Sequence, residues 1–118
     1  MIKRIAFTVY PVREVARARR FYEDDLGLAV SANFMERWVE YEIAGGVFAI
    51  TDMSEGTRPA ADAGGAIAFE VDDVDALTER LRAKGVKVLV EPFSTPVCRM
   101  GVVADSEGNA LILHRVAD

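Results

Sequence analysis

Cysteine and histidine are nearly missing from this sequence, since each occurs once, as Cys98 and His114. A single cysteine excludes an internal disulfide and suits a reducing compartment. Long hydrophobic runs are missing too. The apolar run that begins at Ile5 is too short for a signal peptide, and no stretch approaches the roughly 20 apolar residues that span a bilayer. We therefore expect a cytoplasmic protein without a membrane partner.

Positive charge is also scarce. Lys and Arg number 14 against 19 Asp and Glu, which gives a net charge of -5 and a pI near 4.9. An acidic chain repels the phosphate backbone, and the basic residues from Arg13 to Arg20 are mixed with carboxylates as on a solvated helix face. Nucleic acid is therefore excluded as a partner. The 118 residues, 51% of them hydrophobic, favour one globular domain.

What the sequence does contain is an internal repeat. Ile-Ala-Phe-Thr-Val at 5–9 returns as Ile-Ala-Phe-Glu-Val at 67–71, and the alternation of large with small or polar residues predicts two strands. A helical pattern follows each copy. These helices should end at Gly27 and Gly85 as left-handed C-caps, and Asp72 and Asp73 offer an N-cap to the second.

Three strand-like runs follow each predicted helix, with glycine-rich turns at 45–46 and 108–109. The order β-α-β-β-β therefore occurs twice. We predict an α+β fold of two βαβββ modules, at residues 1–52 and 65–118, joined by a linker at 53–64 within a single domain. The predicted strands are 29–34, 37–44 and 47–52 in the first copy and 86–91, 98–104 and 110–116 in the second.

Strand alternation divides the side chains between two faces of each sheet. The larger ones should pack on the helix: Ile5, Phe7, Val9, Phe48, Ile50, Ile67, Phe69, Val71, Leu111 and Leu113. The opposite, second face should carry Ala6, Thr8, Ala49, Thr51, Ala68, Glu70, Ile112 and His114. Two mixed sheets curled so that their second faces line a shared cleft would suit a small molecule.

Two local motifs add a family resemblance. Phe21-Tyr22 precedes Leu26-Gly27-Leu28, and Asp105–Asn109 resembles an Asp-Pro-Asp-Gly-Asn turn with Ser106 and Glu107 in place of Pro and Asp. With the repeat, these motifs make the chain resemble the vicinal oxygen chelate superfamily, which includes glyoxalase I, bleomycin-resistance proteins, fosfomycin-resistance enzymes and extradiol dioxygenases. The resemblance implies the glyoxalase/bleomycin-resistance fold and a homodimer.

Enzymes of that superfamily usually hold a divalent metal, and the resemblance carries its four ligand positions onto Arg4, Ala49, Ala66 and Ile112. None of these side chains offers a lone pair, and arginine stays protonated. An alignment shift of one residue brings in only Lys3, a weak ligand, and a shift of two brings in only His114. We therefore predict no metal and no cofactor.

His114 and Glu70 are the candidates for acid–base chemistry. Imidazole titrates near neutral pH, and a carboxylate in a partly apolar cleft would have a raised pKa. The two side chains could form a hydrogen-bonded pair if their strands are neighbours. The alternatives are a surface histidine and an exposed strand end.

Other side chains are candidates for ligand contacts. Arg4 could bind an anionic group, and Trp38 with Glu40 shares one strand face that could receive a flat ligand. Tyr10 would lie in a loop at a strand end. Their alternatives are a solvated arginine, a core aromatic and a turn anchor. The full predicted set is Arg4, Thr8, Tyr10, Trp38, Glu40, Thr51, Glu70 and His114.

These residues favour a metal-independent small-molecule-binding protein, similar to the drug-binding resistance members of the superfamily. One alternative is an enzyme, either a metal-free acid–base lyase or isomerase or a metal-dependent lyase or dioxygenase. Another is a non-catalytic interaction module. The sequence leaves open the ligand, any reaction, whether the pocket lies within one chain or across a dimer, and which way the strand of Trp38 faces.

Overall fold

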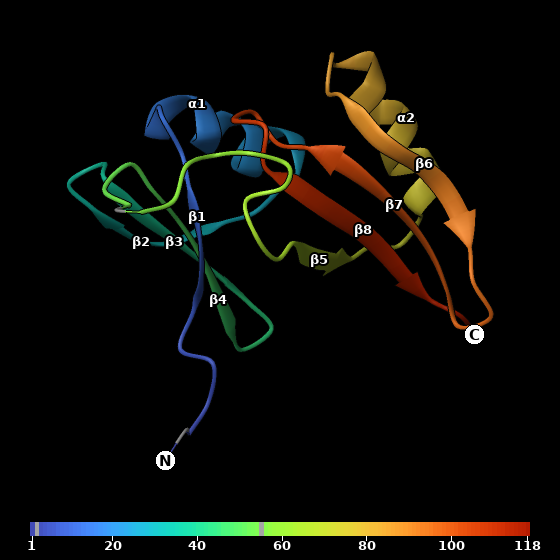
Figure 1. Cartoon of the computed structure of the whole chain (residues 1–118), viewed down its shortest axis with the longest axis horizontal. Helices are drawn as coiled ribbons and strands as arrows, with labels where there is room; N and C mark the ends of the chain where they lie inside the picture. Colours follow the sequence, from blue (N-terminus) through green and yellow to red (C-terminus); the bar gives the residue numbers. More distant parts are fainter. Residues whose placement is uncertain (2, 55) are drawn as a thin grey trace. The chain divides into compact units, whose positions relative to one another are not determined.

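The computed structural model describes residues 1, 3–54 and 56–118 (Figure 1). The chain forms two compact units, Met1–Pro59 and Ala60–Asp118. Each unit contains one mixed four-stranded sheet and the order β-α-β-β-β, so the predicted α+β fold is confirmed. Among the helices in the described part of the chain, none has the length and apolar character needed to cross a bilayer.

The sheet of the first unit has the strand order β1-β4-β3-β2. β1 runs parallel to β4, and the other neighbours are antiparallel. A short α-helix continues directly into a π-helical segment, η1, before β2. The elements are β1 (Thr8–Pro11), α1 (Val15–Arg19), η1 (Arg20–Asp25), β2 (Val30–Phe34), β3 (Trp38–Ile43) and β4 (Gly46–Thr51).

The second unit repeats this topology with the order β5-β8-β7-β6, and β5 runs parallel to β8. Its helix is a regular α-helix. The elements are β5 (Ile67–Glu70), α2 (Val74–Ala83), β6 (Val88–Ser94), β7 (Cys98–Ala104) and β8 (Ala110–Val116). The last two strands have the predicted bounds.

Helix ends follow the predicted capping signals. Asp73 precedes α2, and its Oδ1 accepts a hydrogen bond from the backbone N–H of Ala76 at 2.9 Å. Gly27 and Gly85 have φ values of 76° and 88°, the left-handed conformation that a C-cap needs. The widened turn of η1 ends with the Leu26 N–H donating to the carbonyl oxygen of Phe21.

The core of the first unit is aromatic. Phe48 of β4 lies within 5.0 Å of Tyr22 and 6.2 Å of Tyr41 between ring centroids, and Tyr10 of β1 meets it edge to face at 5.5 Å. All four rings are buried. Aromatic rings bury large areas and prefer tilted or edge-on contacts, so this cluster fixes η1 against the sheet.

The core of the second unit is aliphatic instead. Leu111 and Leu113 of β8 and Leu81 of α2 are fully buried. Thr78 is buried among them, and its hydroxyl donates to the carbonyl oxygen of Val74 at 2.7 Å, which satisfies the polar group within the helix. The two copies therefore share the helix-facing positions but fill them with different chemistry.

The first strand corrects one prediction. β1 begins at Thr8, and Ile5 and Phe7 are 84% and 45% exposed, so they are not core residues. Thr8 pairs with Phe48, whereas Ile67 pairs with Leu111. The structural counterpart of Ile67 is therefore Thr8 and not Ile5. Alignment of the two copies by identical residues was therefore wrong by an odd number of positions. An odd shift moves every side chain to the other face of a strand, so the predicted faces of Phe7, Thr8 and Val9 are wrong.

We expect Leu113→Ala to lower the free energy of unfolding by about 2–5 kcal/mol, because it removes a fully buried side chain and leaves a cavity. Urea denaturation monitored by circular dichroism measures the change. Val97→Ala, at a residue that is 70% exposed, is the control and should stay within about 0.5 kcal/mol of wild type. Equal effects of the two substitutions would contradict the assigned core.

Candidate functional site

The second face of the first sheet carries an indole next to a carboxylate. Trp38 and Glu40 alternate along β3 with Val39 and Tyr41, which are buried on the helix side. Trp38 Nε1 donates to Glu40 Oε2 at 2.8 Å, and the Phe7 ring meets the indole edge to face at 5.2 Å between centroids. The predicted pair of Trp38 and Glu40 therefore lies together, turned away from the helix.

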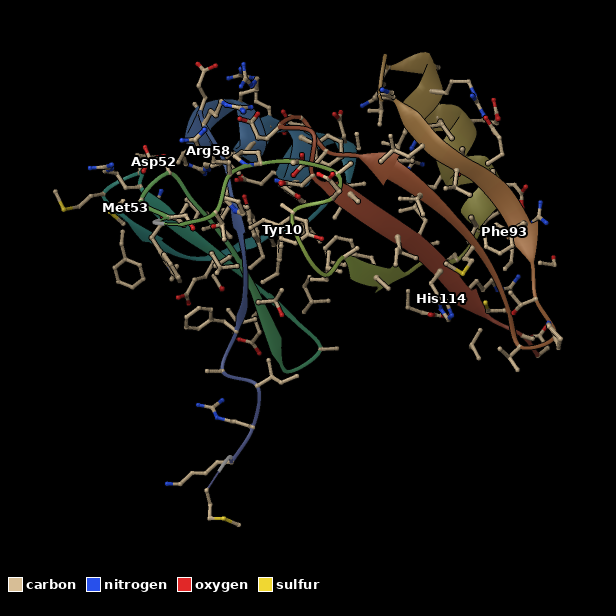
Figure 2. All side chains as sticks on the ribbon, in the orientation of Figure 1. Tyr10, Asp52, Met53, Arg58, Phe93 and His114 are labelled. Carbon is tan, nitrogen blue, oxygen red and sulfur yellow. The ribbon has the colours of Figure 1, made fainter. Side chains whose placement is uncertain are left out.

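Two predicted ligand contacts lie on the helix side instead. Thr8 is in register with Phe48, and Tyr10 is in register with Ile50, so both belong to the face that packs on α1 and η1. Tyr10 is only 7% exposed and forms part of the aromatic core (Figure 2). The predicted second-face position of Thr8 is wrong, and both residues leave the candidate site.

Thr51 lies on the second face, but its hydroxyl already forms two hydrogen bonds with the backbone. Oγ1 donates to the carbonyl oxygen of Arg37 at 2.7 Å and accepts from the N–H of Met53 at 3.1 Å. The residue is 2% exposed. Thr51 therefore stabilises the end of β4. Arg4, by contrast, is exposed in the chain that precedes β1.

The second unit brings Glu70 and His114 together as predicted. β5 and β8 pair these two residues directly, and Nδ1 of His114 lies 2.6 Å from Oε1 of Glu70. The other carboxylate oxygen, Oε2, accepts from the backbone N–H of Val116 at 2.7 Å. Both carboxylate oxygens are thus engaged, and the imidazole is held by one of its nitrogens.

The pKa of Glu70 is lowered, which contradicts the predicted rise. The backbone hydrogen bond from Val116 contributes most, and the hydrogen bond with His114 adds to it. Burial is a smaller, opposing effect because the side chain is 54% exposed. Glu70 is therefore an ionised hydrogen-bond acceptor near neutral pH.

Apolar side chains surround this pair on the same face. Met100 of β7 pairs with His114, Val102 pairs with Ile112, and Phe93 of β6 pairs with Met100. Phe93 is exposed, and the other three are half-buried. We did not predict Met100, Val102 and Phe93 as site residues, although alternation from His114 across the β7–β8 hairpin would have indicated the first two.

Comparison with known families agrees with this architecture. The family model described as the Glyoxalase/Bleomycin resistance protein/Dioxygenase superfamily matches residues 4–113. The chain belongs to this superfamily. Among curated proteins, none matches the sequence.

Solved structures of the superfamily share the fold. TnmS3, an antibiotic binding protein from Streptomyces sp. CB03234, is 26% identical over 98% of each chain, with a TM-score of 0.76. A glyoxalase/bleomycin resistance protein from the same organism is 28% identical, covers 92% of this chain and 97% of its own, and has a TM-score of 0.75. Lactoylglutathione lyase from Agrobacterium tumefaciens, 20% identical with coverages of 97% and 94% and a TM-score of 0.75, shows the fold alone.

The side chains at the metal positions of the superfamily do not fit a metal ion. Ala66 precedes Ile67, and the strand register makes Phe7 its counterpart in the first unit, so the earlier placement on Arg4 is wrong. Phe7, Ala49, Ala66 and Ile112 all lack a donor atom. Over residues 1, 3–54 and 56–118, no group of three or more His, Cys, Asp and Glu residues could hold a metal ion.

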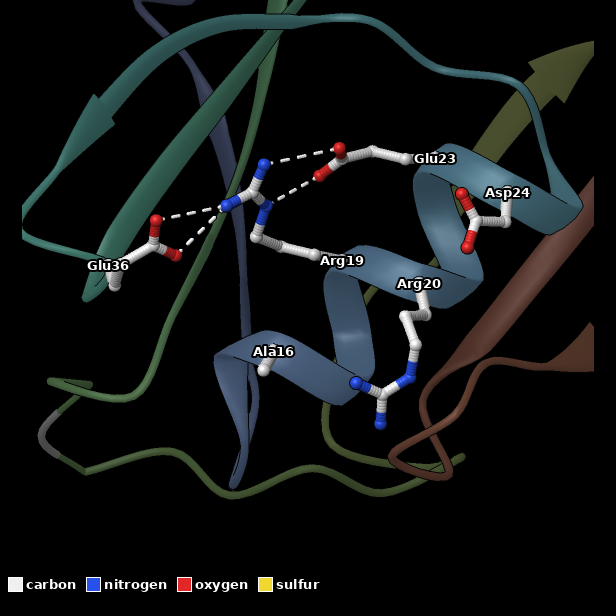
Figure 3. A pocket seen from close by; sticks show the side chains of 6 residues that line it. All are labelled: Ala16, Arg19, Arg20, Glu23, Asp24 and Glu36. Carbon is white, nitrogen blue, oxygen red and sulfur yellow. Dashed lines mark hydrogen bonds and ion pairs between the residues drawn. The ribbon is translucent and has the colours of Figure 1, made fainter.

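A depression of about 230 Å³ beside α1 and η1 is lined mainly by charged residues, and its Arg19 is paired with two of its carboxylates (Figure 3). The Arg19 guanidinium bridges Glu23 at 2.7 Å and Glu36 at 2.9 Å, and Glu23 also accepts from the Tyr41 hydroxyl at 2.9 Å. We infer that these contacts of Arg19 stabilise the β2–β3 hairpin and do not form a ligand site. Its lining is Ala16, Arg19, Arg20, Glu23, Asp24 and Glu36.

A second depression, of about 200 Å³, lies beside Cys98. The thiol is buried as predicted, and its Sγ lies 3.2 Å from the Thr95 hydroxyl. The neighbouring Arg99 forms an ion pair with Asp75 of α2 at 2.7 Å. The arginine is thus engaged by α2, and we assign Cys98 to the structure.

We expect Glu23→Gln to destabilise the protein at neutral pH and to have little effect in acid. Hydrogen bonding from Arg19 lowers the folded-state pKa of Glu23. The ionised form therefore contributes stability above the unfolded-state pKa of about 4.3, and this contribution is lost as the pH falls through the folded-state pKa. Urea unfolding of wild type and Glu23→Gln, at neutral pH and in acid, measures the difference in the free energy of unfolding.

The control is Glu79→Gln, which removes an exposed partner of Arg82 and should have a small effect at either pH. A Glu23→Gln deficit that stays constant between neutral and acid pH would show that the charge of Glu23 is not its source.

Proposed function

We propose that this protein binds a small, largely apolar molecule on the second face of its β5–β8 sheet without a metal ion. The observation that carries the proposal is the second face of the β5–β8 sheet. It leaves Met100, Val102, Ile112 and Phe93 accessible around one polar pair, Glu70 and His114. Accessible apolar surface with a few oriented polar groups is the usual composition of a ligand site.

The comparisons support this proposal. The chain aligns over nearly its whole length with a protein described as antibiotic binding, at 26% identity. The metal positions of the superfamily hold apolar side chains in this chain, so the same face offers van der Waals contact instead of coordination.

The second face of the first unit is a separate candidate surface for a flat ligand. The hydrogen bond to Glu40 fixes the plane of the Trp38 indole, and Phe7 supports its edge. An oriented aromatic ring costs little conformational entropy when a ligand stacks on it. Arg4, exposed before β1, remains a proposed partner for an anionic substituent.

Metal-free acid–base catalysis is the second candidate function. The 2.6 Å contact between an ionised Glu70 and His114 favours it, because a carboxylate bound to one imidazole nitrogen fixes the ring and leaves the other nitrogen for a substrate. Turnover of a bound compound that is lost in His114→Gln would favour this candidate over binding alone.

Ligand binding is measurable as a rise in the melting temperature. We expect at least one member of a panel of apolar aromatic metabolites and antibiotics to raise the melting temperature. A ligand at 100 times its Kd stabilises by about 2.7 kcal/mol. Stabilisation should persist in EDTA and weaken in Ile112→Ala.

Val97→Ala, at an exposed residue that is not among the proposed ligand contacts, is the control and should bind like wild type. A panel without any stabilising compound, or stabilisation that requires an added divalent metal, would overturn the proposal.

We also propose that the protein is a cytoplasmic homodimer, as the single cysteine and the superfamily membership suggest. Light scattering coupled to size-exclusion chromatography should give twice the 12.9 kDa chain mass. A monomer at all concentrations would remove the dimer from the proposal and leave ligand binding unaffected.

A further inference from the structure

We propose that the Glu70–His114 pair recognises a hydroxyl group of a phenol or enol on the bound molecule, with Nε2 of His114 accepting the hydroxyl proton in a hydrogen bond. This inference rests on the proposed function and names the chemical class of its ligand. It follows from the hydrogen bonds of the pair and from the side chains around it.

The first step concerns the carboxylate. Glu70 Oε2 is held by a backbone donor, the N–H of Val116, at 2.7 Å, and Oε1 faces the imidazole at 2.6 Å. An ionised carboxylate can only accept hydrogen bonds. The proton between the two groups therefore belongs to Nδ1 of His114.

The second step concerns the other ring nitrogen. A neutral imidazole with its proton on Nδ1 presents Nε2 as an acceptor. The two nitrogens of the ring diverge, so Nε2 points away from Glu70. In the part of the chain that the structure describes, Nε2 has no hydrogen-bond partner, and the His114 side chain is 31% exposed. The pair thus offers one oriented acceptor to a ligand.

The third step concerns what the acceptor can receive. Its neighbours on this face include Met100, Ile112 and Val102, whose side chains carry no N–H or O–H group and no oxygen acceptor. A hydroxyl has a single proton to donate, and Nε2 satisfies it. An ammonium group would leave further N–H donors unsatisfied over apolar surface, and a carboxylate ligand would be repelled by Glu70. A hydroxyl on an apolar ring therefore matches the face.

The test uses three probes with the same apolar body: 2-naphthol, 2-methoxynaphthalene and 2-naphthylmethylamine. Calorimetric titration of the full chain should show 2-naphthol binding about tenfold more tightly than its methyl ether, as one hydrogen bond in an apolar setting provides. His114→Phe keeps a ring but removes the acceptor. It should bind 2-naphthol and its ether with equal affinity, and thermal unfolding checks that this variant folds.

A spectroscopic measurement tests the role of Glu70 as a positioning residue. The chain has one histidine, so long-range ¹H–¹⁵N NMR reports its tautomer without assignment. Wild type should carry the proton on Nδ1. Glu70→Gln should lose this preference together with the preference for 2-naphthol, whereas Glu91→Gln, at an exposed partner of Arg82, should keep both.

The outcomes separate this inference from the proposed function. Equal affinities of wild type for 2-naphthol and its ether, or tightest binding of the amine, would overturn the inference while ligand binding stands. Failure of all three probes would also overturn it when other compounds of the panel bind. Failure of the entire panel would remove the proposed function itself.

Discussion

The parallel pairing of the first strand with the last strand of each unit decides which side chains are available for function. Thr8 lies beside Phe48 in the first unit, and Ile67 lies beside Leu111 in the second. Because neighbours in register share a face, each pairing assigns every later residue of both strands to the helix or to the second face. At the strand ends the same geometry aligns Pro11 with Thr51 and Glu70 with His114. The equivalent strand ends therefore carry the structural hydroxyl of Thr51 in the first unit and the ionisable pair of Glu70 and His114 in the second.

Local signals in the sequence predicted most of the elements, whereas register between strands was harder to predict. The bounds of β7 and β8 and the cap at Asp73 depend on neighbouring residues, and they are confirmed. Alternation put Glu70 and His114 on the second face, so a contact between them was predicted if their strands were neighbours, and the register confirms that they lie opposite each other. The start of β1 was not predictable, because Ile5 has the residue type expected in a strand. Only the pairing with β4 shows that β1 begins at Thr8. Tyr10 consequently appeared as a loop residue and is in fact core.

The charge state of Glu70 shows a second limit of sequence reasoning. Apolar neighbours alone would raise the pKa of its carboxyl, and burial does act in that direction. The dominant effect comes from the N–H of Val116, which becomes available because β8 continues to Val116 while β5 ends at Glu70. That difference in strand length is a tertiary property with no local signature. It fixes the carboxylate, and the carboxylate in turn fixes the orientation of His114.

The same strand geometry explains how one superfamily fold can host different chemistry. A residue at the position of Ile112 projects from the second face whatever its identity, so a metal ligand there builds a coordination site and an isoleucine builds apolar surface. Two residues further along β8, alternation returns to the same face at His114. Side chains without donor atoms at the metal positions therefore leave the backbone geometry of the second face unchanged. The polar pair of this face then lies at the end of β5, where Glu70 contacts His114. An apolar face with one polar pair at its end is the physical consequence of these residue identities.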